Sequence, residues 1–407
     1  MITLNFGQKF PQALSQIQRC NVLVIGNTGV GKSTLISALF NRPFSNTVTQ
    51  KISAQPYTKT GLPIAVYDTP GLEKDKKQRQ KVKQDVAKFI RQQNQKEPSE
   101  QIHAVWYCVN SQVTRPTEID SNWLDSVAKD LPVLAVITRA NGVEAEWLQP
   151  YLENTLGLQR VVPVLTKKEN LRTKPIEPYG LDSLLSATED LIEEIAQKAI
   201  SNAVNAKAEQ SYAWCRDGCA KVLAAQLVPV PVVKLATAPL QVSMLGSISK
   251  TFGYQFNPQD LGNLVKTVTA VAGFNGLDLL LEDKLSNLPG IDYNNIQTVK
   301  DVMSHLATSL NHAAGILPFK EQLLGILTDL SNSHWVGALP ILRCITAIAT
   351  TLLTGFLAVA YIEAMKEYKE AEYKGQPLPA LEKELVEKAK QLKEVILQSI
   401  ELAYSGV

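Results

Sequence analysis

One short segment near the start of the chain has the residue types and spacing of a phosphate-binding loop. It is Gly26-Asn27-Thr28-Gly29-Val30-Gly31-Lys32-Ser33, in which the glycines let successive backbone N–H groups converge on phosphate oxygens. Lys32 would place a cation on the β- and γ-phosphates, and Ser33 would offer a hydroxyl to Mg²⁺. We therefore expect residues 26–34, Thr34 included, to bind a nucleoside triphosphate together with Mg²⁺.

A second motif, Asp68-Thr69-Pro70-Gly71, follows the strand-like run 64–67. A carboxylate at the end of a neighbouring strand is what the Mg²⁺ side of such a site needs, so we expect Asp68 to lie there. The N–H of Gly71 can then meet the γ-phosphate, which is how loss of that phosphate is transmitted to the chain.

Together the two motifs resemble those of the translation-factor-like class of GTPases, especially its Era- and TrmE-like branch. The resemblance implies that the chain binds GTP and GDP, uses Mg²⁺ and hydrolyses GTP. It also implies a first-switch threonine that binds Mg²⁺ and γ-phosphate, for which we favour Thr49 over Thr47 and Thr58. The expected metal ligands are Ser33, Thr49 and Asp68, and the expected catalytic groups are Lys32, Thr49 and Gly71.

The base-reading motif departs from the [NT]-K-x-D pattern that the resemblance implies after the fifth strand. The matching segment is Thr138-Arg139-Ala140-Asn141. Arg139 keeps an aliphatic stem and a planar cation that can lie against a purine. The Asn141 carboxamide has one acceptor oxygen, whereas a carboxylate accepts from both N1–H and the amino group of guanine. An unpaired polar group costs about 1–3 kcal/mol, so relaxed guanine specificity is expected.

An alternative base motif, Thr166-Lys167-Lys168-Glu169, fits the pattern superficially better. It follows the last strand and has one helix after it, which is where the resembling fold carries an accessory base contact. We therefore prefer Thr138, Arg139 and Asn141 as base-binding residues and expect Lys167 to line the edge of the base.

Two other positions bear on catalysis. Leu72 stands where some GTPases place a water-orienting Gln, so a catalytic group must come from Glu73, the first switch or a partner in trans. Gly29 stands where potassium-activated relatives have Asn, so no potassium dependence is expected from this loop.

Strand-like and helix-like runs alternate from Cys20 onward, and most strand candidates are continuous apolar runs, as in a parallel sheet buried on both faces. The expected strands are 21–25, 62–67, 103–109, 132–137 and 161–165. The expected helices are 32–40, 76–93, 118–129, 144–154 and a closing helix at 181–200. This alternation predicts a three-layer α/β P-loop NTPase domain over residues 20–200, preceded by an amphipathic lead segment over residues 1–19.

Strand-like runs vanish after residue 200, so we expect an all-α domain over 201–370 and a charged C-terminal helix over 371–407. The segments 227–233 and 239–245, with Phe252-Gly253-Tyr254, resemble a helical domain of unknown function that is often fused to Era-like GTPases and thought to be membrane-associated. The likeness covers roughly Ala206–Glu363 and implies a membrane or partner role. The uncharged run Cys344–Ile362 has about the length that spans a membrane, and a buried hairpin is the alternative.

The overall composition argues against nucleic-acid-binding, disulfide-rich and zinc-binding proteins. A net charge of +2 gives no field that points to nucleic acid. Five cysteines in 407 residues are no disulfide framework, and Cys215 and Cys219 lack the partners that zinc needs. With no cleavable signal evident, a cytoplasmic location is expected, with membrane association as an addition.

The leading hypothesis is a slow GTPase switch whose nucleotide state controls the helical half at a membrane or a protein partner. A dynamin-like membrane-remodelling GTPase and a scaffold that binds nucleotide without hydrolysing it stay open as alternatives. Self-association through the nucleotide-binding domain is a further expectation.

Overall fold

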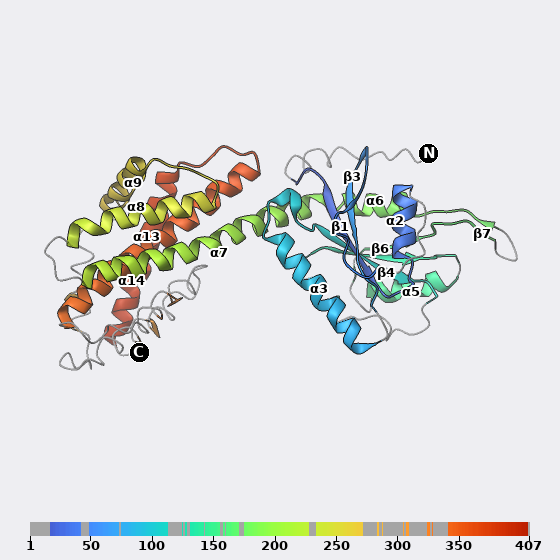
Figure 1. Ribbon diagram of the computed structural model, residues 1–407, viewed down its shortest axis with the longest axis horizontal. Coiled ribbons are helices and arrows are strands. Elements are labelled where there is room, and N and C mark those ends of the chain that lie inside the picture. The colour runs from blue at the N-terminus through green and yellow to red at the C-terminus, as the bar shows by residue number, and fades with distance from the viewer. Residues whose placement is uncertain are drawn as a thin grey trace. The chain divides into compact units, whose positions relative to one another are not determined.

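The computed structural model contains two compact units, Met1–Ala203 and Val204–Val407 (Figure 1). It describes residues 17–41, 49–72, 75–112, 124, 127, 131–141, 143–154, 158, 160–170, 175–227, 233–271, 283, 284, 287, 304, 307, 308, 324, 325, 328 and 341–405. The expected lead segment lies outside these residues except for positions 17–19, of which Ile17 is buried. Thr47, Glu73 and most of the expected helix 118–129 also lie outside them.

The first unit is built on a six-stranded sheet in the order β2-β3-β1-β4-β5-β6. Its strands are β1 (Cys20–Gly26), β2 (Tyr57–Lys59), β3 (Leu62–Asp68), β4 (Ala104–Asn110), β5 (Val133–Thr138) and β6 (Val161–Val164). β1 pairs in parallel with β3 and β4, and β5 pairs in parallel with β4 and β6, which confirms the mostly parallel sheet. The short, polar β2 was not expected, and it runs antiparallel to β3 across a turn at Gly61.

Side chains of one strand point alternately to opposite faces of the sheet. Val22 and Val24 of β1 belong to the core formed with α2 (Lys32–Phe40), α6 (Leu181–Glu189) and the start of α7 (Ile192–Leu227). Leu23 and Ile25 belong to the core formed with α3 (Lys76–Asn94) and α5 (Val143–Asn154). Helices therefore cover both faces, and the expected three-layer α/β fold is confirmed (Figure 1).

The closing helix expected at 181–200 is two helices. α6 ends at Glu189, where the N–H of Asp190 donates to the carbonyl of Ser186, and α7 then runs from Ile192 to Leu227. Apolar periodicity does not show the break, because Leu185 and Ile192 face the same core on either side of it.

His103 and Asn21 tie β1 to the segment before β4. The Asn21 N–H donates to His103 Nδ1 at 2.8 Å, and His103 Nε2 donates to the Pro98 carbonyl at 2.7 Å. The Asn21 amide donates to the carbonyls of Ser99 and Gln101. The imidazole is thus held neutral, and burial lowers the pKa of His103 to about 4.

Acid is expected to destabilise the first unit through His103. Above pH 6.5, the ordinary pKa of histidine, the imidazole is neutral in both the folded and the unfolded protein. Below that value the unfolded chain binds a proton at His103, whereas the folded chain binds it only near pH 4. The stabilisation is therefore present above 6.5 and is lost as pH falls, by about 2 kcal/mol between pH 7 and pH 5. Urea denaturation of the wild type and of His103→Gln at both pH values measures this difference. Equal pH dependence of the two proteins would contradict it.

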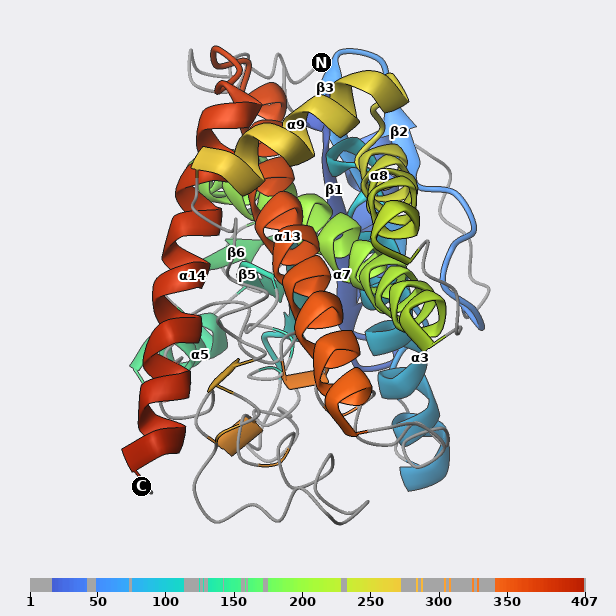
Figure 2. The same cartoon turned by 90° about the vertical axis from the view of Figure 1, so that its left-hand side faces the viewer.

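Every element of regular secondary structure in the described residues of the second unit is a helix. It contains α7 from Val204 onward, α8 (Val233–Thr251), α9 (Pro258–Val271), α13 (Ile341–Tyr373) and α14 (Leu381–Ser405). α13 packs against α14 on one side and α7 on the other (Figure 2). α8 is joined to α13 by bonds from Gln241 to Thr354 and between Ser249 and Tyr361. The expected helical character of this half is confirmed.

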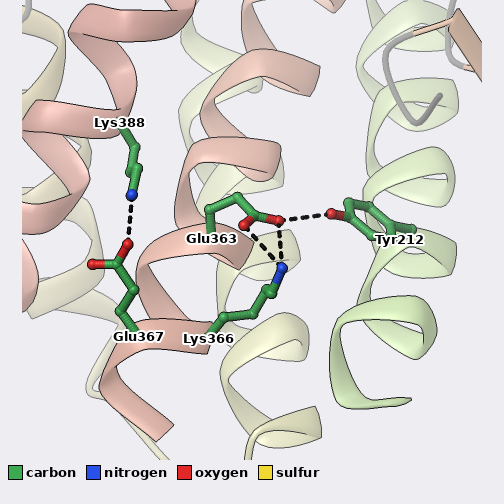
Figure 3. A network of polar contacts seen from close by, with 5 residues as sticks. All are labelled: Tyr212, Glu363, Lys366, Glu367 and Lys388. Carbon is green, nitrogen blue, oxygen red and sulfur yellow. Dashed lines mark hydrogen bonds and ion pairs between the residues drawn. The ribbon is translucent and has the colours of Figure 1, made fainter. Parts of the chain in front are cut away.

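A network of polar contacts links α7, α13 and α14 (Figure 3). The Tyr212 hydroxyl donates to Glu363 Oε1 at 3.0 Å, and Lys366 Nζ lies 3.0 Å from Glu363 Oε2. One turn along α13, Glu367 is paired with Lys388 of α14 at 2.5 Å. Burial and the Glu363 charge raise the pKa of Tyr212, so its hydroxyl stays a donor. The charged end of α13 is thus satisfied by groups of the same helical unit.

α13 carries a span, Ala347–Tyr373, that is long and apolar enough to cross a membrane. Within the unit, 83% of its most apolar window is buried. A core helix of a soluble protein has the same length and composition, so these two properties do not decide between the two roles.

Candidate nucleotide-binding site

The phosphate loop joins β1 to α2. Gly26 ends β1 and Gly31 precedes α2, with φ of 145° and 103°, values that favour glycine. A Cβ on Gly26 would lie 2.4 Å from the Cys108 carbonyl oxygen of β4, so a larger residue would force the strands apart. The first N–H groups of α2 have no partner within the helix, and they follow this loop as an anion site requires.

Lys32 lies across its own loop. Its side chain is buried, and Nζ donates to the carbonyl oxygens of Gly26 and Asn27, each at 3.0 Å. The loop backbone therefore holds the ammonium group over the segment expected to bind phosphate. A buried cation in this position can attract the β- and γ-phosphates strongly, because hydrogen bonds between charged groups are about twice as strong as neutral ones.

Three oxygen-bearing side chains from separate segments meet beside the loop. Thr49 Oγ1 donates to Asp68 Oδ2 at 2.8 Å, and Ser33 Oγ lies 3.3 Å from the same oxygen. Asp68 is buried at the end of β3, and its Oδ1 has no hydrogen-bond partner among the described residues.

These groups fit Mg²⁺. Hydroxyl and carboxylate oxygens are the ligands that this ion prefers, and a buried carboxylate oxygen without a donor is suited to a cation. Within the described part of the chain, no group of three or more His, Cys, Asp and Glu is arranged to hold a metal. A metal ion bound here would therefore be held by the hydroxyls of Ser33 and Thr49 around the single carboxylate of Asp68.

The Asp68–Gly71 motif lies directly against the phosphate loop. The Leu72 N–H donates to the Gly26 carbonyl at 3.1 Å, and the Thr28 N–H donates to the Leu72 carbonyl at 3.3 Å. A Cβ on Gly71 would lie 2.5 Å from Thr28 Cα and 2.6 Å from Thr28 N. Only glycine lets the two segments approach this closely. The Leu72 side chain is 3% exposed and packs in the core on the α3 side of the sheet.

Thr138 supports the phosphate loop from β5. Its hydroxyl, in a buried side chain, donates to the Val30 carbonyl and lies 3.2 Å from that of Val109. The sequence placed Thr138 among the base contacts, whereas here its hydroxyl braces the loop backbone. Arg139 is exposed, with φ of 53° and a carbonyl that accepts from Ser111 Oγ at 2.6 Å.

Asn141 and Glu169 lie side by side, and Asn141 Nδ2 donates to Glu169 Oε2. The two segments that the sequence presented as rival base motifs therefore lie next to each other. Lys167 is exposed on the same loop as Glu169. The sequence did not single out Glu169 itself, although it closes the motif that was set aside.

A small hairpin holds Glu169 in place. β7 (Glu169–Asn170) pairs antiparallel with β8 (Pro175–Ile176), and Leu165 and Tyr179 exchange backbone hydrogen bonds at 3.0 and 2.9 Å. The Tyr179 hydroxyl donates to the Ala140 carbonyl at 2.8 Å, one residue before Asn141. No pattern in the sequence indicates this contact, because it depends on pairing across residues 165–179.

Known proteins are similar in sequence to the part of the chain that carries this site. Residues 21–139 match the family model described as 50S ribosome-binding GTPase. Septin-9 of Rattus norvegicus is 24% identical over an alignment of 221 residues that covers 47% of this chain and 37% of that protein, so the chain spans little more than a third of this relative.

Two solved structures are similar at lower identity. Toc33 from Arabidopsis thaliana, in complex with Mg²⁺ and GMPPNP, is 18% identical over 46% of this chain and 92% of its own, with a TM-score of 0.33. A probable GTP-binding protein, engB, is 16% identical over 44% of this chain and 99% of its own, with a TM-score of 0.31. The family match therefore identifies residues 21–139, which carry the phosphate loop and most strands of the sheet, as part of a P-loop GTPase domain.

Proposed function

We propose that this chain is a GTP-binding switch that hydrolyses GTP slowly and whose nucleotide state controls its helical unit. The observation that carries the proposal is the convergence of Ser33, Thr49 and Asp68 beside the phosphate loop. These residues come from α2, from the segment between the motifs and from β3. A Mg²⁺ ion and a γ-phosphate bound among them would join segments that separate when the phosphate leaves, which is the basis of a switch.

The roles of the residues follow from their places. In this proposal Ser33, Thr49 and Asp68 hold Mg²⁺, which would neutralise charge on the phosphates when bound. The loop 26–34 and the Gly71 N–H bind the phosphates. The base lies against the Arg139 stem, between the loops that carry Arg139, Asn141 and Lys167.

Slow turnover is supported by the environment of Leu72. Its buried apolar side chain cannot orient water, and its backbone is hydrogen-bonded to the phosphate loop. Lys32, Thr49 and Gly71 can stabilise charge on the γ-phosphate, but they do not supply a water-orienting group. Unassisted hydrolysis on the order of 10⁻⁴ to 10⁻² s⁻¹ is expected, with acceleration by a partner in trans.

Control of the helical unit is supported by α7, which contributes to the cores of both units. Ile192 and Ile195 pack in the core of the first unit, while Tyr212 and Cys219 pack in the core of the second. We favour a protein partner for the helical unit, because most of the apolar span of α13 is buried and its charged end is paired. The apolar span itself supports the second candidate, a role at a membrane.

Two measurements on the full chain test the proposal. Single-turnover hydrolysis of GTP should be slow, should require Mg²⁺ and should exceed hydrolysis in buffer. Hydrogen exchange of the α7, α8, α13 and α14 amides should differ between the GDP-bound protein and the protein bound to a non-hydrolysable GTP analogue. Hydrolysis no faster than in buffer would favour the scaffold alternative, and identical exchange would contradict control of the helical unit. Strong stimulation by lipid vesicles would favour membrane remodelling.

A further inference from the structure

The hydrogen bond between Asn141 and Glu169 determines which way the Asn141 amide faces. An ionised carboxylate only accepts hydrogen bonds, so the NH₂ group of Asn141 must point toward Glu169. The Oδ1 atom of Asn141 is then the acceptor that this side chain can offer to a ligand. Without Glu169, the amide could rotate and present its NH₂ group to the base.

Glu169 is held there by backbone contacts on both sides. Glu169 of β7 pairs with Ile176 of β8. Outside this pair, Leu165 and Tyr179 exchange backbone hydrogen bonds, and the Tyr179 hydroxyl donates to the Ala140 carbonyl. Asn141 and Glu169 are both half-buried, so neither is a fully solvated surface group. The hydrogen bond between Asn141 and Glu169 is therefore determined by the fold of the β7–β8 hairpin and not by the chance meeting of two mobile side chains.

The two side chains together provide the acceptors that guanine requires. Guanine presents two adjacent donors, N1–H and the 2-amino group, and a single aspartate can accept both. Asn141 Oδ1 can accept only one side of that pair well. A carboxylate has about four lone-pair sites, so Glu169 can accept from Asn141 and still accept from a ligand.

We propose that Asn141 and Glu169 form a divided guanine-reading site, in which Asn141 Oδ1 accepts from N1–H and the Glu169 carboxylate accepts from the 2-amino group. This inference rests on the proposed function, since it assumes that the base lies at this loop. It replaces the relaxed specificity expected from Asn141 alone with selective recognition of guanine. Glu169 is then a specificity-determining residue of the site.

Inosine and xanthosine nucleotides test the Asn141 and Glu169 contacts separately. Hypoxanthine keeps N1–H but lacks the 2-amino group, and xanthine carries an oxygen in place of that group. Wild-type protein with Mg²⁺ should bind GDP about 10-fold or more tightly than IDP. Glu169→Ala should remove most of that preference by weakening GDP binding, while IDP binding changes less than about 2-fold. Glu169→Gln should shift the preference from GDP toward XDP, because the amide can donate to the xanthine oxygen.

Glu177→Gln is the matched control. Glu177 is the carboxylate of the same hairpin that is paired with Lys168, and its replacement should leave the ratio of GDP to IDP affinity unchanged. Calorimetric titration of each protein with each diphosphate gives the ratios. Unchanged IDP binding in Glu169→Ala shows that the loop is still folded.

The outcomes distinguish this inference from the proposed function. If wild-type protein binds GDP and IDP equally, or if Glu169→Ala weakens both equally, the divided site is wrong while nucleotide binding stands. If the wild type binds neither nucleotide, the proposed function itself fails. A GDP preference that Glu169→Ala removes without loss of IDP binding supports the inference.

Discussion

Lys32→Ala is expected to lower the affinity for GTP and GDP by at least about 100-fold. Each hydrogen bond between an ammonium group and a phosphate contributes about 1.5–3 kcal/mol, and Lys32 is placed to make such bonds to two phosphates. The buried position of Nζ, over the carbonyls of Gly26 and Asn27, means that water cannot replace it fully. Calorimetric titration in the presence of Mg²⁺ measures the loss.

Lys96→Ala is a matched control for this variant, because Lys96 is a half-exposed lysine of the same unit that lies 4.0 Å from the Glu100 carboxylate. It should bind nucleotide as the wild type does. Binding by Lys32→Ala that equals the wild type would show that the nucleotide does not use this loop.

Gly71→Ala is expected to lower the rate of GTP hydrolysis by about 100-fold or more, while GDP binding falls far less. The added methyl group would lie 2.5 Å from Thr28 Cα, an impossible contact with backbone, so the Asp68–Gly71 motif must withdraw from the loop. Withdrawal removes the Gly71 N–H from the γ-phosphate, and the loss of one donor to developing charge costs about 10²–10³ in rate. The loop that binds the α- and β-phosphates is left in place.

Single-turnover hydrolysis and GDP titration of Gly71→Ala separate the two effects. Gly246→Ala is the control, because its methyl group would meet Leu261 of the helical unit at an ordinary 3.7 Å. Hydrolysis by Gly71→Ala at the wild-type rate would mean that this motif does not contact the γ-phosphate.

Much of the sheet could be predicted because its strands are buried on both faces. Runs such as Val22–Ile25 are apolar without interruption, since alternate residues enter one core or the other. β2 escaped prediction because Tyr57–Lys59 is short, polar and half-exposed, so it lacks any such signal. The helix boundary at residue 200 was wrong for a related reason: α7 continues through it, with apolar residues that serve two successive cores.

The parts of the candidate site that depend on motif spacing could be predicted. The parts that depend on pairing between distant segments could not. The sequence placed Ser33, Thr49 and Asp68 on one metal, and the structure brings their oxygens together, whereas Thr58 lies exposed on β2. The neighbourhood of Asn141 and Glu169 arises from a hairpin whose pairing leaves no periodic trace. Two motifs that the sequence presents as alternatives for one role can therefore be neighbours in the folded protein.

The role of α13 could not be predicted from composition. A membrane span and the central helix of a helical unit need the same length and apolarity. The contacts of the charged end of α13 are what composition does not show: Glu363 accepts a hydrogen bond from Tyr212 on α7, and Glu367 is paired with Lys388 on α14. These contacts join residues far apart in the chain, so they appear only when the helices are packed.

The most direct test of the central claim is a calorimetric titration of the full chain with GTP and with ATP, each with Mg²⁺ and each with the ion removed by EDTA. GTP should bind at least about 10-fold more tightly than ATP, because adenine presents an acceptor where Asn141 and Glu169 also present acceptors. Removal of Mg²⁺ should weaken GTP binding, since Ser33, Thr49 and Asp68 would lose the ion that links them to the phosphates. Equal or tighter binding of ATP, or GTP binding that is indifferent to Mg²⁺, would contradict the account.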